Sequence, residues 1–231
     1  MLCKTSFFLA GALALGALAV PIPDCPDNQN ENIYNPPNAD NKATTGSLTV
    51  DQLTQIAPLT VSCSDADFPE ECADAIAAVP ALNKSFDTYG IKTAGEKAAL
   101  VAYTLFESVN YKYKKNHSPG RPGQGTRMMA MPNFIAQYAT AVAGADAVAT
   151  ASAAGGDAGL EAVLALVNSE DDLSFGSAAW FYSTVCTEDV KAGVQAGTVD
   201  GWHNFLTACV GTTLAEERDT PWVAAKAVIL A

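Results

Sequence analysis

Apolar residues recur at helical spacing along most of the chain from about residue 48, and this pattern restricts what the chain can fold into. Val50, Leu53 and Ile56 stand three residues apart, which places their side chains on one face of a helix. The chain is therefore expected to be mainly α. Equivalent patterns predict further helices over 69–79, 93–107, 132–142, 160–167, 175–186, 202–210 and 220–229.

The segment over residues 93–107, TAGEKAALVAYTLFE, carries the strongest of these patterns. Its apolar positions form a broad stripe, and Thr93 with Glu96 has the spacing of a capping box. The 69–79 pattern is expected to end where Pro80 follows, because proline lacks the N–H that a helix interior needs.

The character of the sequence changes between residues 111 and 131, which hold Tyr, Lys, Gly, Pro, Thr and Met with local alternation. The GRPGQG stretch supplies turn residues. We interpret this segment as one or two short strands around an irregular loop. The predicted fold class is thus mainly α (α+β), a helical domain with a small inserted β-hairpin.

The first 19 residues have the pattern of a secretory signal peptide: Lys4 precedes an apolar run, and Ala17 and Ala19 offer a cleavage site. Residues 20–45 are rich in Pro, Asn and Asp, and we expect a flexible leader or a pro-segment. Residues 46–231 form one predicted domain. The sequence therefore predicts a secreted, extracellular protein without a membrane span.

The net charge argues against one broad class of partners. The chain has a formal net charge of −12, and removal of Lys4 with the signal peptide brings it to −13. Phosphates would be repelled over most of such a surface, so general nucleic-acid binding is not expected.

Five cysteines remain after the signal peptide, and an oxidising compartment favours two disulfides with one odd thiol. Cys63 with Cys72 would close a short acidic loop, and Cys186 with Cys209 would join two helical segments. Cys25 is then the odd residue, although four cysteines permit three pairings and proximity does not decide among them. The spacings fit no zinc pattern, and neither a metal site nor a cofactor is predicted.

No acidic residue stands between Glu107 and Asp146, although the chain as a whole is acidic. This segregation predicts a positive cleft wall that faces an anionic or polar partner. The alternative is a solvated basic loop that balances nearby carboxylates. Interleaved aromatic and amide side chains favour the cleft, since a sugar-binding groove needs apolar faces and paired donors and acceptors. The basic residues of the stretch are Lys112, Lys114, Lys115, Arg121 and Arg127, with His117 among them.

Glu107 ends the 93–107 segment directly after Leu105 and Phe106. A carboxylate there meets the negative end of the helix dipole, and its apolar neighbours would keep water away from it. Both effects raise the pKa of the carboxyl, as a general acid at neutral pH requires. The alternative is an exposed glutamate on a fraying last turn.

The run FESVNYKYKKN (106–116), followed by PGRPGQGTRMMAMPNF (119–134), resembles the core of the lysozyme-like superfamily, in which a catalytic Glu ends a helix and a β-hairpin follows. SFGSAAWFYSTVC (174–186) is similar to the buried Trp-bearing helix of chitinase-type members. In detail the sequence resembles secreted fungal muramidase catalytic domains most, over roughly residues 90–230.

The resemblance implies that Glu107 is the general acid. Val109 and Met128 depart from the family pattern, so a catalytically weakened relative is also consistent with the sequence. The remaining implied site residues are groove-lining side chains and substrate contacts: Gln124, Thr126 and Arg127 beside the acid, then Tyr111, Tyr113, Asn116 and Asn133.

A second carboxylate, which ordinary glycosidases use, is not found in the predicted hairpin. Without one, Glu107 would act alone in the manner of a lytic transglycosylase or a goose-type lysozyme, and the sequence leaves hydrolysis and transglycosylation open. The next acids along the chain are Asp146, Asp157, Glu161, Glu170, Asp171 and Asp172.

We therefore expect a secreted, monomeric glycoside hydrolase, a muramidase that cleaves the β-1,4 bonds of bacterial peptidoglycan with Glu107 as general acid. Its partner would be a polysaccharide, with no nucleic acid and no membrane. A chitinase-type hydrolase on the same scaffold is the nearest alternative. A non-catalytic secreted saccharide-binding or effector protein, and a helical structural protein whose resemblance is accidental, are the alternatives of a different class.

Overall fold

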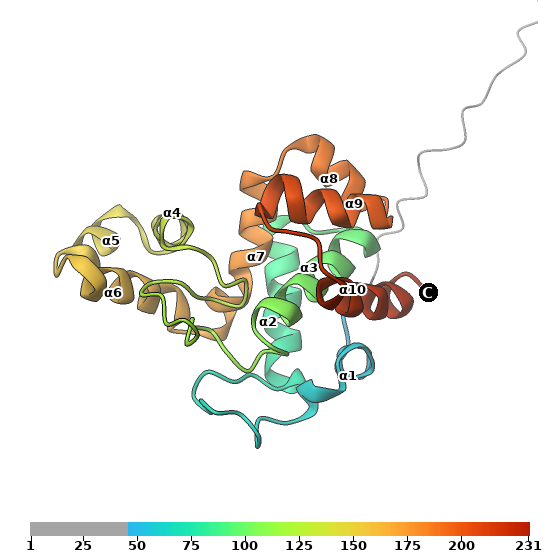
Figure 1. Cartoon of the computed structure of the whole chain (residues 1–231), viewed down its shortest axis with the longest axis horizontal. Helices are drawn as coiled ribbons and strands as arrows, with labels where there is room; N and C mark the ends of the chain where they lie inside the picture. Colours follow the sequence, from blue (N-terminus) through green and yellow to red (C-terminus); the bar gives the residue numbers. More distant parts are fainter. Residues whose placement is uncertain (1–45) are drawn as a thin grey trace, which may run out of the picture. The chain divides into compact units, whose positions relative to one another are not determined.

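Residues 46–231 are described by the computed structural model, and helices supply almost all of their regular structure (Figure 1). The mainly α class is therefore confirmed. The predicted signal peptide, the predicted leader and Cys25 lie outside the described residues. The elements are α1 (Val50–Ile56), η1 (Pro58–Val61), α2 (Ala75–Tyr89), α3 (Ala94–Glu107), α4 (Pro132–Ala143), α5 (Ala145–Ser152), α6 (Gly156–Asn168), α7 (Asp171–Val185), α8 (Glu188–Gln195), α9 (Val199–Asn204), η2 (Phe205–Val210) and α10 (Glu216–Ile229).

Helix α3 lies in the core, because every residue from Gly95 to Leu105 is buried. The predicted capping box begins it: the Thr93 hydroxyl accepts from the Glu96 N–H, and the Glu96 carboxylate accepts from the Thr93 N–H. Helices α10, α8 and α7 pack against α3, and Figure 1 shows α10 beside it. This packing fixes the position of α3 and therefore of its last residue, Glu107.

Helix α2 begins later and ends later than the sequence pattern predicts. Asp74 caps its first turn by accepting from the Ala77 N–H, and Pro80 lies inside the helix. The helix continues past Pro80 because packing of α2 on α7 outweighs the loss of one backbone hydrogen bond. It ends at Gly90, whose φ of 69° is a left-handed conformation that glycine adopts without strain.

The predicted β-hairpin is not present between α3 and α4. The backbone there makes two isolated bridges, one between Lys115 and Gly125 and one between Gly125 and Ala130. Both bridges share Gly125, and left-handed φ angles at Thr126 and Met129 turn the chain before a ladder can extend. The segment is a folded loop instead of a hairpin.

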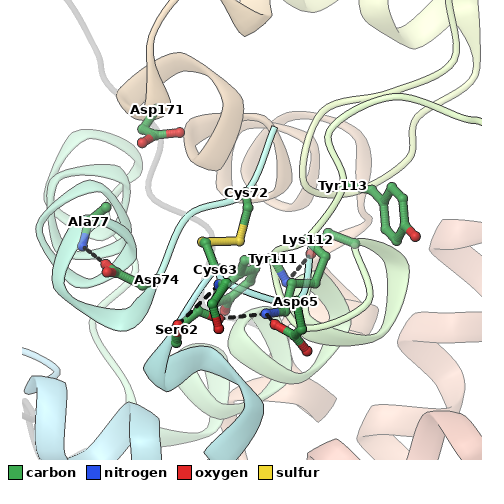
Figure 2. Close-up of a disulfide and its surroundings, with 12 residues drawn as sticks. Ser62, Cys63, Asp65, Cys72, Asp74, Ala77, Tyr111, Lys112, Tyr113 and Asp171 are labelled. Atoms are coloured by element: carbon green, nitrogen blue, oxygen red, sulfur yellow. Dashed lines mark hydrogen bonds and ion pairs between the residues drawn. A yellow bond between two sulfur atoms is a disulfide. The ribbon is translucent and has the colours of Figure 1, made fainter. Parts of the chain in front are cut away.

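Both predicted disulfides are present, Cys63–Cys72 and Cys186–Cys209. Beside the first, Lys112 reaches the Ser62 carbonyl at 2.6 Å and an Asp65 carboxylate oxygen at 2.5 Å (Figure 2). The disulfide loop is thereby fastened to the segment that follows α3. Within residues 46–231, no helix is both long enough and apolar enough to cross a bilayer.

Candidate functional site

Glu107 is held at the end of α3 by an arginine from a distant helix. Arg218 of α10 donates from Nη1 to Oε1 of Glu107 at 2.5 Å, and both side chains are largely buried. Burial raises the pKa of the Glu107 carboxyl, and the hydrogen bond and charge of Arg218 oppose that rise without cancelling it. The direction agrees with the sequence prediction, whereas the arginine partner was not predicted.

The backbone directly after Glu107 is strained. Val109, Asn110 and Tyr111 have φ angles of 51°, 56° and 62°, so three successive non-glycine residues are left-handed. Each such residue costs roughly 1–2 kcal/mol, and a β-branched valine is the least suited of them. Strain of this kind persists only where surrounding contacts fix it, and it is common at functional sites.

Arg127 supplies much of that fixing. Its guanidinium is fully buried, donates from Nη1 to the carbonyls of Tyr111 and Tyr113, and reaches Asp171 from Nη2 at 3.3 Å. It also lies over the ring of Phe175, 4.8 Å from the centroid. Arg127 therefore holds the strained turn in place from within the core.

A buried carboxylate, Glu71, orients a histidine near Glu107. One oxygen of Glu71 accepts from the backbone N–H groups of Lys114 and Lys115, and the other lies 2.9 Å from Nε2 of His117. The imidazole also stacks on Phe68 with ring centroids 3.7 Å apart. Glu71 and Phe68, which both precede α2 in the chain, therefore fix the position and orientation of His117.

Two hollows meet at this turn. The first, named the polar pocket because most of its lining residues are polar or charged, has a volume of about 460 Å³ and contains Glu107 and His117 in its wall, together with apolar surface from Phe68 and Met129. The second is an apolar pocket of about 610 Å³ formed by residues of α1, η1, α3 and α10. Val109 lines both, so the strained residue stands between a polar and an apolar chamber. The polar pocket is also lined by Asp67, Phe68, Tyr113, Lys115, Asn116, Ser118, Gln124 and Met129.

The structure brings together four of the residues that the resemblance implied as a site. Glu107, Tyr113, Asn116 and Gln124 line the polar pocket. Asn116 donates from Nδ2 to Gln124 Oε1 at 3.0 Å, and the Tyr113 hydroxyl donates to Asp67 at 2.8 Å. These contacts orient the amide and phenol groups along one wall.

The other four predicted residues lie elsewhere. Tyr111, Thr126 and Arg127 are fully buried and belong to the core beneath the loop. Asn133 is exposed on α4 and lines none of the pockets described above. None of these four side chains is placed to touch a ligand in the polar pocket.

The predicted positive cleft wall is weakened by the structure. Three of its five Lys and Arg residues, and His117, pair with carboxylates from other parts of the chain, which favours the alternative interpretation of a basic loop that balances nearby acids. The pairs are Lys112 with Asp65, Lys115 with Glu161, His117 with Glu71 and Arg127 with Asp171. Lys114 donates to the Asn168 carbonyl and Arg121 to the Met131 sulfur instead.

A second carboxylate does line the pocket of Glu107, but it is Asp67 and none of the acids that the sequence suggested. Sequence reasoning also missed Glu71 and Arg218, which lie far from Glu107 in the chain. The one sequence signal that pointed to this part of the pocket was His117, a titratable side chain within the acid-free stretch. Among residues 46–231, no group of three His, Cys, Asp or Glu side chains is arranged to hold a metal ion.

Comparison with known proteins gives one informative similarity. No protein-family model matches the chain, and no solved structure matches it. A curated protein of Fusarium oxysporum (strain Fo5176), a bifunctional dioxygenase–epoxy alcohol synthase, is 37% identical over 147 residues. The match covers 59% of this chain and 11% of that protein, so the chain spans about a tenth of its relative's length.

This similarity overturns the predicted function. The relative is named for dioxygenase and epoxy alcohol synthase activities, not for cleavage of a glycan. The predictions of a glycoside hydrolase, of muramidase activity on peptidoglycan and of a polysaccharide partner are therefore wrong, and the chitinase-type and saccharide-binding alternatives are not retained. The resemblance to the lysozyme-like superfamily stays a prediction about the fold.

Proposed function

We propose that residues 46–231 form a domain that binds an amphipathic small molecule, an apolar chain with an oxygenated end of the epoxy-alcohol kind. The observation that carries this proposal is the pair of pockets that share Val109, one apolar and one polar. A ligand with two chemically different ends matches such a pair better than a wholly polar or wholly apolar molecule does.

The apolar pocket suits the chain of the ligand. Ile56 and Leu59 line one part of it, Leu105 and Phe106 another, and Pro221 of α10 a third. Its volume of about 610 Å³ is within the range of small-molecule sites. Each buried methylene contributes about 0.8 kcal/mol, so four of them supply about 3 kcal/mol of binding free energy.

The polar pocket suits the oxygenated end. Tyr113 and Gln124 offer a hydroxyl and an amide, and Glu107 and His117 offer groups that exchange protons. A hydroxyl needs both a donor and an acceptor nearby, and an epoxide oxygen needs a donor. This set of side chains provides both kinds of group.

The relative supports the choice of chemistry. An epoxy alcohol, the product in its name, carries a ring oxygen and a hydroxyl on a carbon skeleton. The matched stretch is 11% of that protein, so we assign to this domain the binding of such a molecule and not the oxidative reactions themselves. We also propose that the protein is secreted, because its two disulfides suit an oxidising compartment.

Calorimetric titration tests the proposal with a ten-carbon epoxy alcohol whose epoxide adjoins the hydroxyl-bearing carbon. We expect saturable binding by the wild type and a loss of at least about tenfold in affinity for Leu59→Asp, which puts a charge into the apolar pocket. Ile76→Asp is the matched control, since Ile76 is also exposed but lies on α2 and lines neither pocket. Absence of binding by the wild type, or equal loss in both variants, would contradict the proposal.

A further inference from the structure

Two proton-exchanging side chains from different parts of the chain share the wall of the polar pocket. Glu107 comes from the end of α3, and His117 comes from the loop between α3 and α4. Each is held by a second charged group, Arg218 for the carboxyl and Glu71 for the imidazole. A pocket that only binds a ligand does not require two acid–base side chains, each held in position by a charged neighbour.

Glu107 is arranged to accept a proton. Its Oε1 receives the Arg218 hydrogen bond, which leaves Oε2 for a ligand or a water. The guanidinium of Arg218 lies 4.3 Å from the ring centroid of Phe106, so the cation is held on both sides. Burial raises the pKa of the carboxyl, and a carboxylate with a raised pKa is a stronger base.

His117 lines the same pocket, and one of its two ring nitrogens is engaged by a carboxylate. Because its Nε2 faces the Glu71 carboxylate, that nitrogen carries hydrogen, and Nδ1 is the atom left for exchange. Glu71 cannot turn away, since two backbone N–H groups hold its other oxygen. Stacking on Phe68 fixes the plane of the ring.

We propose that the domain opens the epoxide ring of its ligand by adding water, with Glu107 as the base and His117 as the acid. This inference rests on the proposed function. Glu107 takes a proton from water as the water oxygen bonds to one epoxide carbon. The carbon–oxygen bond at that carbon breaks, and its electron pair stays on the ring oxygen. The imidazolium Nδ1–H of His117 protonates that oxygen, which gives a vicinal diol.

The step needs only water as co-reactant. Afterwards Glu107 is protonated and His117 is neutral, and exchange with solvent restores both. No electron is gained or lost, so neither oxidant nor reductant takes part. The reaction would consume the class of product that an epoxy alcohol synthase forms. Glu71 and Arg218 are positioning residues, because each acts through the group that it holds.

The experiment uses the full chain, the ten-carbon epoxy alcohol and heavy-oxygen water, with the triol product measured by mass spectrometry. We expect the wild type to add one heavy oxygen per molecule. Glu107→Gln and His117→Asn should each lower turnover at least about 100-fold, with affinity in calorimetry changed by less than about threefold. His203→Asn is the matched control, since His203 also pairs with a carboxylate, Asp219, but does not line the pocket.

The outcomes separate this inference from the proposed function. Binding by the wild type without triol formation overturns the reaction and leaves the binding proposal standing. Turnover that survives in both Glu107→Gln and His117→Asn overturns the two assigned roles. Glu71→Gln should lower kcat without raising KM, whereas a merely structural role would change thermal stability and leave kcat intact. Absence of any binding by the wild type overturns the proposed function, and this inference with it.

Discussion

Arg218 donates from Nη1 to Oε1 of Glu107 at 2.5 Å, although the two residues are 111 positions apart in the chain. The bond joins the first turn of α10 to the last residue of α3. Both helices also contribute to the apolar pocket, through Phe106 on α3 and Pro221 on α10. The ion pair therefore holds α3 and α10 together at Glu107, the residue through which α3 also lines the polar pocket.

Loss of this ion pair should destabilise the fold. Arg218→Ala leaves a largely buried carboxylate without its cation and removes the contact with Phe106, which should cost about 3 kcal/mol in the free energy of unfolding. Urea denaturation measures the change. Lys84→Ala is the control, because Lys84 pairs with Asp172 on the surface and should cost less than about 1 kcal/mol. Equal losses in the two variants would contradict the buried role of Arg218.

Two carboxylates should give opposite pH dependences of stability. Burial raises the pKa of Glu107 above its ordinary value of 4.5, so the folded state binds this proton more tightly than the unfolded state does. Its contribution to stability therefore falls as pH rises from 4.5 through the raised pKa. For Glu161, burial acts in the same direction, but hydrogen bonds from Lys115 and the Gly123 N–H lower its pKa overall. Its contribution is complete above the ordinary value and is lost as pH falls through the lowered pKa.

Urea denaturation from about pH 3 to about pH 8 tests these two opposite pH dependences, because the Glu161 contribution is lost only below the ordinary pKa of 4.5. The stability of the wild type relative to Glu107→Gln should decline as pH rises in this range. The stability of the wild type relative to Glu161→Gln should decline as pH falls. If both differences move in the same direction, the environment assigned to Glu107 is incorrect.

Relief of backbone strain at Val109 should stabilise the protein. Val109 has a φ of 51° and is 54% exposed, so glycine removes strain at little loss of apolar burial. We expect Val109→Gly to raise the free energy of unfolding by about 1 kcal/mol. Val223→Gly is the control, because Val223 is equally exposed but lies within α10, where glycine should lower stability by roughly 0.5 kcal/mol. Thermal melting measures both changes: the melting temperature should rise in Val109→Gly and fall in Val223→Gly.

Removal of the Arg127 guanidinium should release the strained turn. Arg127→Met fills similar space but leaves the carbonyls of Tyr111 and Tyr113 without this donor, which should cost about 3 kcal/mol or more. Amide hydrogen exchange over residues 109–113 should speed up as well. Arg121→Met serves for comparison, since Arg121 is exposed, and a change there should stay within about 0.5 kcal/mol. Unaltered exchange in Arg127→Met would show that other contacts hold the turn.

Local sequence signals predicted the parts of the fold that depend on near neighbours. The Thr93 and Glu96 pair predicted the start of α3 because a capping box involves residues three apart. The short loop between Cys63 and Cys72 favoured their pairing without deciding it, and the structure contains this disulfide. The position of Glu107 at the end of a helix, and the direction of its pKa shift, also came from adjacent residues.

The site as a whole depends on contacts between distant segments, which local patterns do not contain. Arg218 approaches Glu107 only because α10 packs along α3, and Glu71 approaches His117 only because the disulfide loop lies against the segment after α3. Alternating residues suggested a β-hairpin, but left-handed residues such as Thr126 interrupt any ladder there. Distant acids also pair with Lys112, Lys115 and Arg127 of the basic stretch that suggested a positive cleft.

Photoaffinity labelling tests most directly whether one ligand occupies both pockets. The probe is the ten-carbon epoxy alcohol with a diazirine at the far end of its chain. We expect saturable labelling of η1 or of the Glu216–Ile229 helix, competed by the unlabelled epoxy alcohol and weakened by Leu59→Asp. Labelling that concentrates on α4 to α6, or that unlabelled ligand does not compete, would contradict a shared site at Val109.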